Sequence, residues 1–572
     1  MRLGHTFSYA VRSLRRAPLF SASVVVTLTV AIGSAAAIFS LLNGVLLRPL
    51  PFGHADRLVG VWFDMASLSL NHAQQTPGTY ETFRRYARTI DAIGLYPEGS
   101  ANVSDPDGRG DPERINTTWA TASTIPLLEI SPLVGRTFSK AEDVPNGPRV
   151  ALISEGYWRS HYAADKNVVG KTLMIYGRAT TIVGVMPARF RFPGAATEIW
   201  LPLQLDLNNP YSGGFSYNAV ARLKAGVSIE AAQRDFATVL PRTVEVTPNL
   251  TPTVPMKMVL DQAKPVVQIV PMRDDVVGNV SSALWMVAAA ALVLLLAACA
   301  NVANLLLVRA DARHRELAVR SALGAGRARV LAHFFTESAV LTGLSCALGL
   351  VAAWAGIHAL VTAGPSQIPR LAEVHIDGAV VAFTIAVGVL IALASSAIPA
   401  LRFMRADPLS GLRDGGRGGT AGGHRQRARG ALVAAQVAFA LVVLSSSALL
   451  VRSFQRLRAV HPGFEANGVA TLWFMLQSQR YPSDTSVVQF AARLIARAAQ
   501  APGVTRVGVG SWLPLEENGQ NHDPVYVEGE ASPAKIPQLA SYLSIDSGYF
   551  GAMGIPIIAG HTFDRIERQR AG

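Results

Sequence analysis

Two short strings come closest to a nucleotide-binding or nucleophile motif, DKNVVGKT at 165–172 and LISEGYW around Ser154. A phosphate-binding loop needs a glycine at its first position so that the backbone can wrap a phosphate, and Asp165 stands there. The string also leads into a predicted strand, so we expect Gly170 to form a turn before it. Ser154 lacks the GxSxG turn that exposes a nucleophile. Neither string supports hydrolase chemistry.

Metal-ligand spacing is missing as well. The twelve histidines contain no HExxH pattern, and His314, His333 and His358 are isolated residues that we expect to be packed or interfacial. Cys299 and Cys346 both lie inside apolar runs, which leaves neither a CxxC site nor a disulfide framework. No paired carboxylates form a recognisable acid/base site. The sequence therefore predicts no catalytic, metal-binding or cofactor-binding residues, and a protein that is not an enzyme.

Three polar residues lie inside apolar runs, where they have two interpretations. Asn301 and Asn304 are three residues apart and share a helix face, and Glu337 lies about one turn into a later run. Because polar groups are costly at membrane depth, such residues can mark a substrate or proton path. The alternative is hydrogen bonding between helices for the asparagines and a position near the cytoplasmic surface for Glu337. The second interpretation is favoured, since no chain of acidic residues crosses the predicted membrane region.

A charged segment at 313–338, RHRELAVRSALGAGRARVLAHFFTES, is the most informative short element. Glu316 and Arg320 are four apart, a spacing that supports a helix. Arg313, Arg320 and Arg327 recur every seven residues and so lie on nearly one face, and Gly324 allows a bend. The segment is either a short helix that docks on a cytoplasmic partner or a hairpin whose charges only set membrane topology.

The composition places these residues in a membrane protein. Half of the 572 residues are hydrophobic, only 16% are charged, and the mean hydropathy is +0.28. The net charge of +13 could suggest nucleic acid, but the basic residues cluster against the ends of apolar runs, as topology-setting charges do. No nucleic-acid partner is predicted. Apolar runs long enough to span a bilayer occupy 19–47, 283–308, about 334–361, about 378–401 and 431–451.

The links between these runs predict the topology. The links 309–333 and 402–430 are rich in arginine, whereas 362–377 carries only Arg370 against two acidic residues. We therefore expect the N-terminus (1–18), 309–333 and 402–430 inside, and 48–282, 362–377 and 452–572 outside. The run 19–47 could also be a secretory signal, but it is about twice the length of a signal core, which favours an uncleaved helix. The Gly- and Arg-rich stretch within 402–430 predicts a flexible cytoplasmic linker.

The segment 48–282 is predicted to be a soluble α+β domain. Short β-branched runs at 149–154, 171–177 and 180–186 predict strands. Apolar residues at helical spacing predict helices over 77–90 and over 229–240, the second capped by Ser228. The fold class is thus an α-helical transmembrane bundle of five spans with α+β extracytoplasmic domains.

The segment 452–572 resembles the start of 48–282. Each follows a span, and each has an amphipathic helix about 35 residues further on, at 79–90 and at 485–499. LLEISPLVGRTFSKAED (127–143) then matches YFGAMGIPIIAGHTFDRIE (549–567), with Gly135, Thr137 and Phe138 aligned on Gly560, Thr562 and Phe563. This order predicts an internal duplication whose second copy is incomplete, so that the chain is expected to be truncated.

On these residues the chain resembles a known family. RELAVRSALGAGRARVLAHFFTESAVL is similar to the cytoplasmic loop of FtsX-like permeases, and RVALISEGYW, VGKTLMIYGRATTIVGVMPARFRFP and GRTFSKAED resemble the MacB-type periplasmic core domain. The order of helices and domains is similar to that of duplicated orphan permeases of acidobacteria. It implies a 283–401 permease region, periplasmic core domains at 48–282 and 452–572, and a multi-pass protein of the bacterial inner membrane.

The resemblance also implies a function. Such a permease couples a separate cytoplasmic ABC ATPase to extracytoplasmic domains, for export or for mechanotransmission, within the lipid bilayer. The coupling role is carried over to the matching positions of the loop 309–333, which are Arg313, Arg315, Glu316, Arg320, Gly324 and Arg327. Two departures stand out: a full duplicated permease has eight spans, and MacB itself has a fused ATPase. The alternative is a membrane scaffold or signalling protein whose exported domains bind an envelope or periplasmic partner.

Overall fold

The computed structural model describes residues 17–563, except for 69, 107–111, 195, 210, 279, 313–326, 364–368, 406–421, 475, 477–480, 516–520 and 526–537. The chain divides into two compact units, which are described separately. One contains Met1–Arg48 and Val276–Arg458, and the other contains Pro49–Asp275 and Ala459–Gly572.

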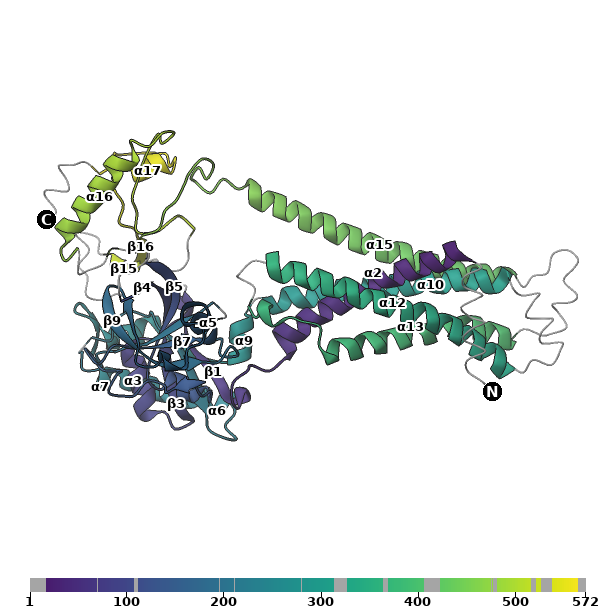
Figure 1. The fold of residues 1–572 in the computed structure, drawn as a ribbon, viewed down its shortest axis with the longest axis horizontal. Helices are drawn as coiled ribbons and strands as arrows, with labels where there is room; N and C mark the ends of the chain where they lie inside the picture. Colours follow the sequence, from purple (N-terminus) through teal and green to yellow (C-terminus); the bar gives the residue numbers. More distant parts are fainter. Residues whose placement is uncertain are drawn as a thin grey trace, which may run out of the picture. The chain divides into compact units, whose positions relative to one another are not determined.

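The first unit is helical (Figure 1). Among the described residues, five helices are long and apolar enough to cross a membrane. They are α2 (Pro18–Leu42, continued by the π-helical turn η1, Asn43–Leu47), α10 (Val280–Ala312), α12 (Arg327–Ala363), α13 (Gly378–Arg405) and α15 (Gly422–Ala459).

Four of these helices, α2, α10, α12 and α13, pack on one another. Their common core includes Val24 and Leu28 of α2, Val302 of α10, Leu341 of α12 and Ile391 of α13. The helices α2 and α12 come especially close, since a Cβ placed on Gly33 would lie 3.0 Å from the Gly349 oxygen. Small residues at such a crossing let two membrane helices approach. The most apolar stretch of α15, in contrast, contains no buried residue.

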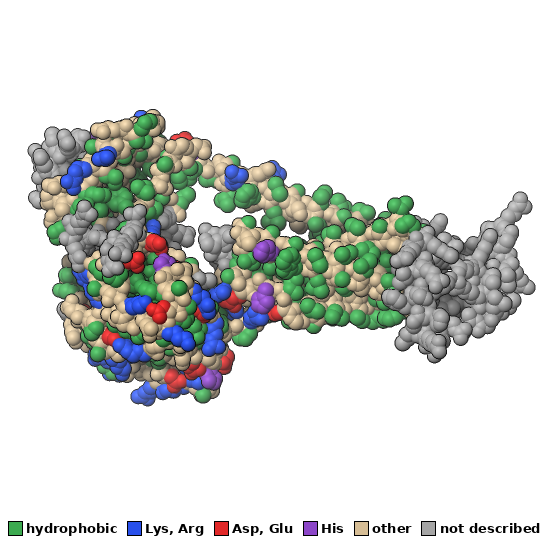
Figure 2. Space-filling model, viewed as in Figure 1, with side chains coloured by type: hydrophobic (Ala, Val, Ile, Leu, Met, Phe, Trp, Pro, Cys, Tyr) green, Lys and Arg blue, Asp and Glu red, His purple; other side chains and the backbone are tan. Residues whose placement is uncertain are grey.

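The outward faces of the helices are covered by large hydrophobic side chains (Figure 2). Trp285, Leu344, Trp354 and Leu390 are each more than half exposed. A soluble protein rarely leaves such a continuous apolar surface uncovered, whereas a bilayer solvates it.

The second unit begins with an antiparallel sheet in the order β14-β1-β11-β3, with β2 paired to β1. Its core holds Phe63 of β1, Phe83 of α3 and Phe236 of α6. The bounds are β1 Leu58–Met65, β2 Leu70–Ala73, β3 Ile90–Tyr96, β11 Asn218–Leu223, β14 Val266–Pro271, α3 Pro77–Tyr86, α6 Ile229–Val239, α7 Thr243–Val246, α8 Met256–Ala263 and α9 Met272–Val277.

A second sheet has the strand order β6-β9-β7-β10-β5-β4-β8, and an additional β9–β8 pairing closes six of these strands into a barrel. Its core contains Ile153, Leu173, Ile182 and Ile199. The bounds are β4 Glu98–Ser104, β5 Glu113–Ala120, β6 Val134–Gly135, β7 Val150–Ser154, β8 Thr172–Ile175, β9 Arg178–Met186 and β10 Ile199–Pro202, with α4 Thr124–Leu127 and α5 Glu155–Tyr162 between strands.

Beyond α15, the described elements are α16 (Asp484–Ala498), β15 (Asn521–Val525), β16 (Gln538–Tyr542) and α17 (Tyr549–Ala552). The predicted combination of a helical membrane bundle with an α+β domain is confirmed. The strands expected at 149–154, 171–177 and 180–186 are β7, β8 and β9. Ser228 caps α6 as expected, accepting a hydrogen bond from Ala231 N at 3.2 Å.

Two boundary predictions are wrong. The helix expected over 77–90 ends at Tyr86, because the Ala87 backbone is extended and Ile90 already begins β3. The linker expected over 402–430 is helical at both ends, since α13 continues to Arg405 and α15 begins at Gly422. Arginine and alanine are good helix formers, and that explains why helices continue past the apolar runs. Residues 406–421 lie outside the described part.

Candidate functional site

The predicted cytoplasmic coupling residues cannot be located. Arg313, Arg315, Glu316, Arg320 and Gly324 lie outside the described residues. Arg327 is the first residue of α12, and its side chain is not described. The segment connects the end of α10 at Ala312 to the start of α12, so its role as a coupling loop stays a prediction.

Of the three polar residues inside the spans, Glu337 is buried, whereas Asn301 and Asn304 are partly exposed. Glu337 is 4% exposed, beside buried Ser338 and Thr342 on the same helix α12. Asn304 Oδ1 is buried without a hydrogen-bond partner among the described residues, so the bond between helices expected for it is not seen at that atom. A continuous row of acidic residues is not found across the described spans.

The end of α2 is held by a buried arginine from the link between α12 and α13. The side chain of Arg370 is 5% exposed. Its Nη1 donates to the carbonyl oxygens of Val45, at 3.3 Å, and Arg48, at 2.9 Å, while Nη2 donates to Glu373 Oε2 at 2.8 Å. The last carbonyls of a helix have no partner within the helix, and a cation there also complements the helix dipole. Arg370 therefore caps α2 through η1.

Asp377 joins the same helix end to the start of α13. Its Oδ2 accepts from Asn43 Nδ2 at 3.0 Å and from Arg48 Nη2 at 3.3 Å, and its Oδ1 accepts from Val380 N at 3.0 Å. The Val380 N–H and the Arg48 charge hold the pKa of Asp377 below its ordinary value. We call Asn43, Arg48, Arg370, Glu373 and Asp377 the α2-end network.

The α2-end network was missed at the sequence level. Residues Arg370, Glu373 and Asp377 entered only as a charge count for topology. The available signal was three ionisable residues in one short link between two spans, a placement that favours partners at the membrane boundary.

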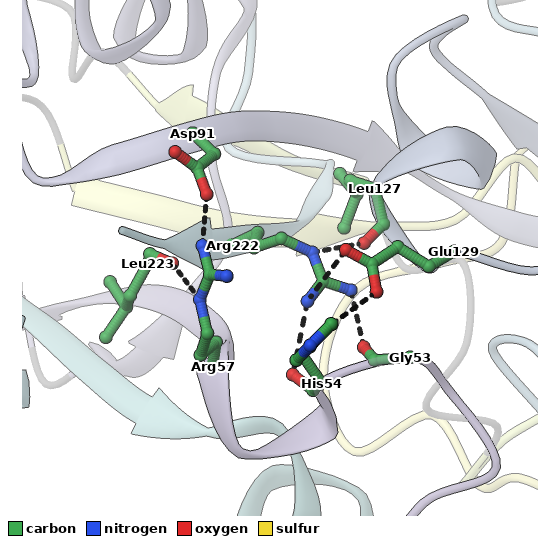
Figure 3. Close-up of polar contacts among 8 residues, drawn as sticks. All are labelled: Gly53, His54, Arg57, Asp91, Leu127, Glu129, Arg222 and Leu223. Atoms are coloured by element: carbon green, nitrogen blue, oxygen red, sulfur yellow. Dashed lines mark hydrogen bonds and ion pairs between the residues drawn. The ribbon is translucent and has the colours of Figure 1, made fainter. Parts of the chain in front are cut away.

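After Arg48 the chain enters the second unit, where a second buried arginine fixes it (Figure 3). Arg222 of β11 has a side chain that is 5% exposed. Its Nε donates to Leu127 O at 2.7 Å, its Nη2 to Gly53 O at 2.7 Å and its Nη1 to His54 O at 3.2 Å. One guanidinium thus ties the first sheet to the incoming segment and to the short helix α4.

The contact between the incoming segment and α4 is close (Figure 3). Gly53 N donates to Leu128 O at 3.1 Å, and His54 Nδ1 lies 2.8 Å from Glu129 Oε2. A Cβ placed on Gly53 would lie 2.6 Å from the Glu129 Cβ, so the position accepts only glycine. The hydrogen bond from His54 and the Arg222 charge hold the pKa of Glu129 below its ordinary value. We call Gly53, His54, Leu128, Glu129 and Arg222 the entry joint.

The exit from this domain lies beside its entrance. β1 and β14 are antiparallel neighbours, with Val59 opposite Pro271, so the start of β1 and the end of β14 lie at the same end of the sheet. After β14, α9 carries Asp275, whose Oδ1 accepts from Trp62 Nε1 of β1 at 2.8 Å. Burial raises the pKa of Asp275 to about 6. The entering segment is therefore bonded to β11 through Arg222, and the leaving segment is bonded to β1 of the same sheet through Trp62.

The residues weighed for enzyme chemistry have structural roles. Gly170 is in the left-handed region, with φ +93°, just before β8, and the predicted turn is confirmed. Ser154 Oγ accepts from Tyr157 N at 3.0 Å and caps α5. Within the described ranges no group of three or more His, Cys, Asp or Glu side chains is placed to hold a metal ion.

Two family models match the chain. The MacB-like periplasmic core domain matches residues 21–239, and the FtsX-like permease C-terminal region matches residues 288–408. The entry joint lies within the first matched region. The α2-end network takes Asn43 and Arg48 from the first region and Arg370, Glu373 and Asp377 from the second.

Named relatives show the same similarity. The chain is 25% identical over 284 residues to the uncharacterized ABC transporter permease YknZ of Bacillus subtilis. The aligned part covers 49% of this chain and 65% of that protein. It is 23% identical over 211 residues to the macrolide export ATP-binding/permease protein MacB 1 of Yersinia pestis, covering 36% of this chain and 30% of that protein. The chain thus spans just under two thirds of the first relative and less than a third of the second.

The crystal structure of the periplasmic region of MacB from Actinobacillus actinomycetemcomitans also matches. The TM-score is 0.28 at 12% identity, and the match covers 41% of this chain and 94% of that one.

Proposed function

Because the chain is an ABC transporter permease of the MacB/FtsX type and a multi-pass inner-membrane protein, we propose that it couples a separate cytoplasmic ATPase to its extracytoplasmic domains. Permeases of this type work with ABC ATPases. ATP binding on one side of the membrane would move the helices, and the helices would move the exported domains. The work done is export or extraction of a molecule, or transmission of force to an envelope partner.

The observation that supports coupling is that the chain segments at both ends of the exported domain are hydrogen-bonded to that domain. The entering segment is fixed by Arg222 and the Gly53–Leu128 bond, and the leaving segment by the Asp275–Trp62 bond. Arg222 of β11 and Trp62 of β1 belong to the same sheet, so both segments are bonded to one sheet. A flexible connection, as in a scaffold that merely displays a binding domain, would absorb such displacement instead.

On the cytoplasmic side, we propose that the loop 309–333 receives the ATPase. Arg313, Arg320 and Arg327 would present one charged face to that partner, and Gly324 would allow the chain to turn back to the membrane. A charged helix face suits docking on an acidic surface of a soluble protein.

The docking role is tested by reversing one charge. Arg320→Glu in the tagged full-length chain should abolish recovery of an ABC ATPase from native membranes while expression and membrane insertion stay at parent levels. Arg425→Glu, the same change in the other arginine-rich link, is the matched control and should bind normally. Equal recovery by Arg320→Glu and the parent chain would assign these arginines to topology alone.

The same preparations test the absence of enzyme activity. Since the sequence has no phosphate-binding loop, the purified chain alone should hydrolyse no ATP, and hydrolysis should appear only with the recovered partner. ATP hydrolysis that persists in a clean preparation of the chain by itself would contradict this expectation.

A further inference from the structure

Residues 459–563 contain a hydrogen bond that reproduces the one at the centre of the entry joint. Glu465 N donates to Met553 O at 2.8 Å, as Gly53 N donates to Leu128 O at 3.1 Å. Each donor lies a few residues after the end of a membrane helix, α15 at Ala459 in one case and η1 at Leu47 in the other. Each acceptor is the residue directly after a four-residue helix, α17 or α4.

The backbone around the two acceptors has the same conformation. Leu128 has φ −83° and ψ −7°, and Met553 has φ −85° and ψ −2°. The next residue is left-handed in both, Glu129 with φ +54° and Gly554 with φ +63°. The glycines aligned in the sequence repeat, Gly135 and Gly560, follow at equal separations and have φ +80° and +85°. The sequence repeat is therefore also a repeat of backbone geometry.

The contacts that position each short helix are repeated too. Leu95 N donates to Thr121 Oγ1 at 3.1 Å, and Thr121 N donates back to Leu95 O at 3.0 Å. In the second segment, Val509 N donates to Asp546 Oδ1 at 2.8 Å, and Asp546 N donates to Val509 O at 2.9 Å. Earlier in each segment, Thr76 and Ser483 start α3 and α16 with the same capping box.

At the crossing itself, two residue types are exchanged between the segments. In the first, glycine stands on the incoming segment at 53 and glutamate after the short helix at 129. In the second, glutamate stands at 465 and glycine at 554. A Cβ on Gly53 would lie 2.6 Å from the Glu129 Cβ, and a Cβ on Gly554 would lie 2.8 Å from the Glu465 Cγ. Where the incoming segment meets the residue after the short helix, there is therefore room for one side chain. That side chain is a glutamate in both segments.

Each of these glutamates also contacts a histidine on the segment that enters the same joint. His54 Nδ1 lies 2.8 Å from Glu129 Oε2, and His461 Nε2 lies 3.5 Å from Glu465 Oε1. The exchange thus moves the glutamate to the other chain segment while it keeps the same kind of partner. Two independent crossings with this arrangement point to a requirement of the site rather than to one accidental contact.

We infer that residues 465 and 553–554 form a second entry joint, and that Gly53, Glu129, Glu465 and Gly554 are positioning residues that fix each incoming segment to the end of the short helix α4 or α17. The protein then receives helix motion at two joints of one design, through α2 and through α15. The transmission role rests on the proposed coupling function, whereas the reciprocal fit of glycine and glutamate does not.

The fit is tested by exchanging the residues in the full-length chain in lipid nanodiscs. Gly53→Glu alone should open the first joint, and amide exchange in the peptide containing residue 53 should accelerate about tenfold or more, because exchange follows local opening. Gly53→Glu combined with Glu129→Gly converts the first joint to the arrangement of the second. This double variant should return exchange to within about threefold of the parent.

Matched variants apply the test to the second joint and guard against misfolding. Gly554→Glu should open it, and Gly554→Glu with Glu465→Gly should restore it. Glu129→Gly alone removes the contacts of Glu129 with His54 and Arg222 but keeps the Gly53–Leu128 hydrogen bond, so exchange at residue 53 should accelerate by less than in Gly53→Glu; this variant remains informative if Gly53→Glu fails to fold. Double variants that exchange as fast as the single ones, or single variants that exchange like the parent, would overturn the inference. Since no ATPase is present, the outcome is independent of the proposed function.

Discussion

Buried charged side chains in the exported domain are satisfied in different ways. Arg222 donates to three backbone carbonyl oxygens and keeps its charge at any ordinary pH. Glu81, 2% exposed, is paired with Arg84 and Arg85. Asp275 receives one hydrogen bond from Trp62, and burial raises its pKa to about 6. Of these three groups, Asp275 is the one whose charge changes near pH 6, and it lies in α9, the helix before α10.

We predict that Asp275→Asn stabilises the exported domain at pH 8 and stabilises it about half as much at pH 5. The raised pKa means that the folded state favours the protonated acid, so the stability from this group is fully present below the ordinary pKa of 3.8 and is lost as pH rises from there through about 6. The loss is at most about 3 kcal/mol at about 1.4 kcal/mol per pKa unit. Thermal unfolding of the purified chain at pH 5 and 8 measures it, with an expected gain of about 4–8 °C at pH 8.

Asp261→Asn serves as the control for that experiment. Asp261 is exposed and pairs with Lys257 on α8, and its removal should change the unfolding temperature equally little at both pH values. A pH-independent effect of Asp275→Asn would show that the charge of Asp275 does not limit stability.

Replacing Arg222 should weaken the entry joint. Arg222→Met keeps the apolar stem but leaves the carbonyl oxygens of Gly53 and Leu127 without a donor, at a cost of about 2–4 kcal/mol. We expect a lower unfolding temperature and faster proteolysis near residues 49–57. Arg234→Met, at an exposed position of α6, should stay within about 0.5 kcal/mol of the parent. Equal stability of the two variants would show that Arg222 does not fix the joint.

At the scale of elements, local signals predicted well and distant contacts did not. The Ser228 cap and the strands β7 to β9 follow from neighbouring residues, and hydropathy identified the spans because a bilayer demands long apolar helices. The end of α3 was misplaced because Ile90 fits a helical pattern and yet belongs to β3. The entry joint depends on residues near 53, 128 and 222, which no local pattern relates to one another.

The α2-end network predicts a specific disulfide. A Cβ placed on Gly44 would lie 3.6 Å from the Val374 Cβ, within the range of disulfides, about 3.5–4.5 Å. In a chain whose native cysteines, Cys299 and Cys346, are replaced by serine, Gly44→Cys with Val374→Cys should form a disulfide under mild oxidation. Mass spectrometry of a tryptic digest detects it, and the two single-cysteine variants are the controls. Free thiols at both positions after oxidation would contradict the placement of the 370–377 link against α2.

At the scale of the whole molecule, the arginine-rich links predict which segments face the cytoplasm. Alkaline phosphatase fused after residue 200 should be active, and fused after residue 420 it should be inactive, because the enzyme needs an oxidising compartment. Activity at 420, or none at 200, would refute the predicted topology. The similarity to MacB-like and FtsX-like regions supports the assignment of 48–282 as exported, but the sidedness itself stays a prediction.

Coupling between the ATPase and the exported domain is tested most directly by hydrogen exchange in their complex. The chain, purified with the ATPase that Arg320 is expected to bind, is compared without nucleotide and with ATP and vanadate. The α2-end network and the entry joint lie in sequence on one path from α2 into the exported domain. We predict that exchange in residues 43–57 changes by about threefold or more when ATP is bound, a size that local opening readily produces. A nucleotide response confined to the ATPase and to residues 309–333, with residues 43–57 unchanged, would contradict coupling through the first span.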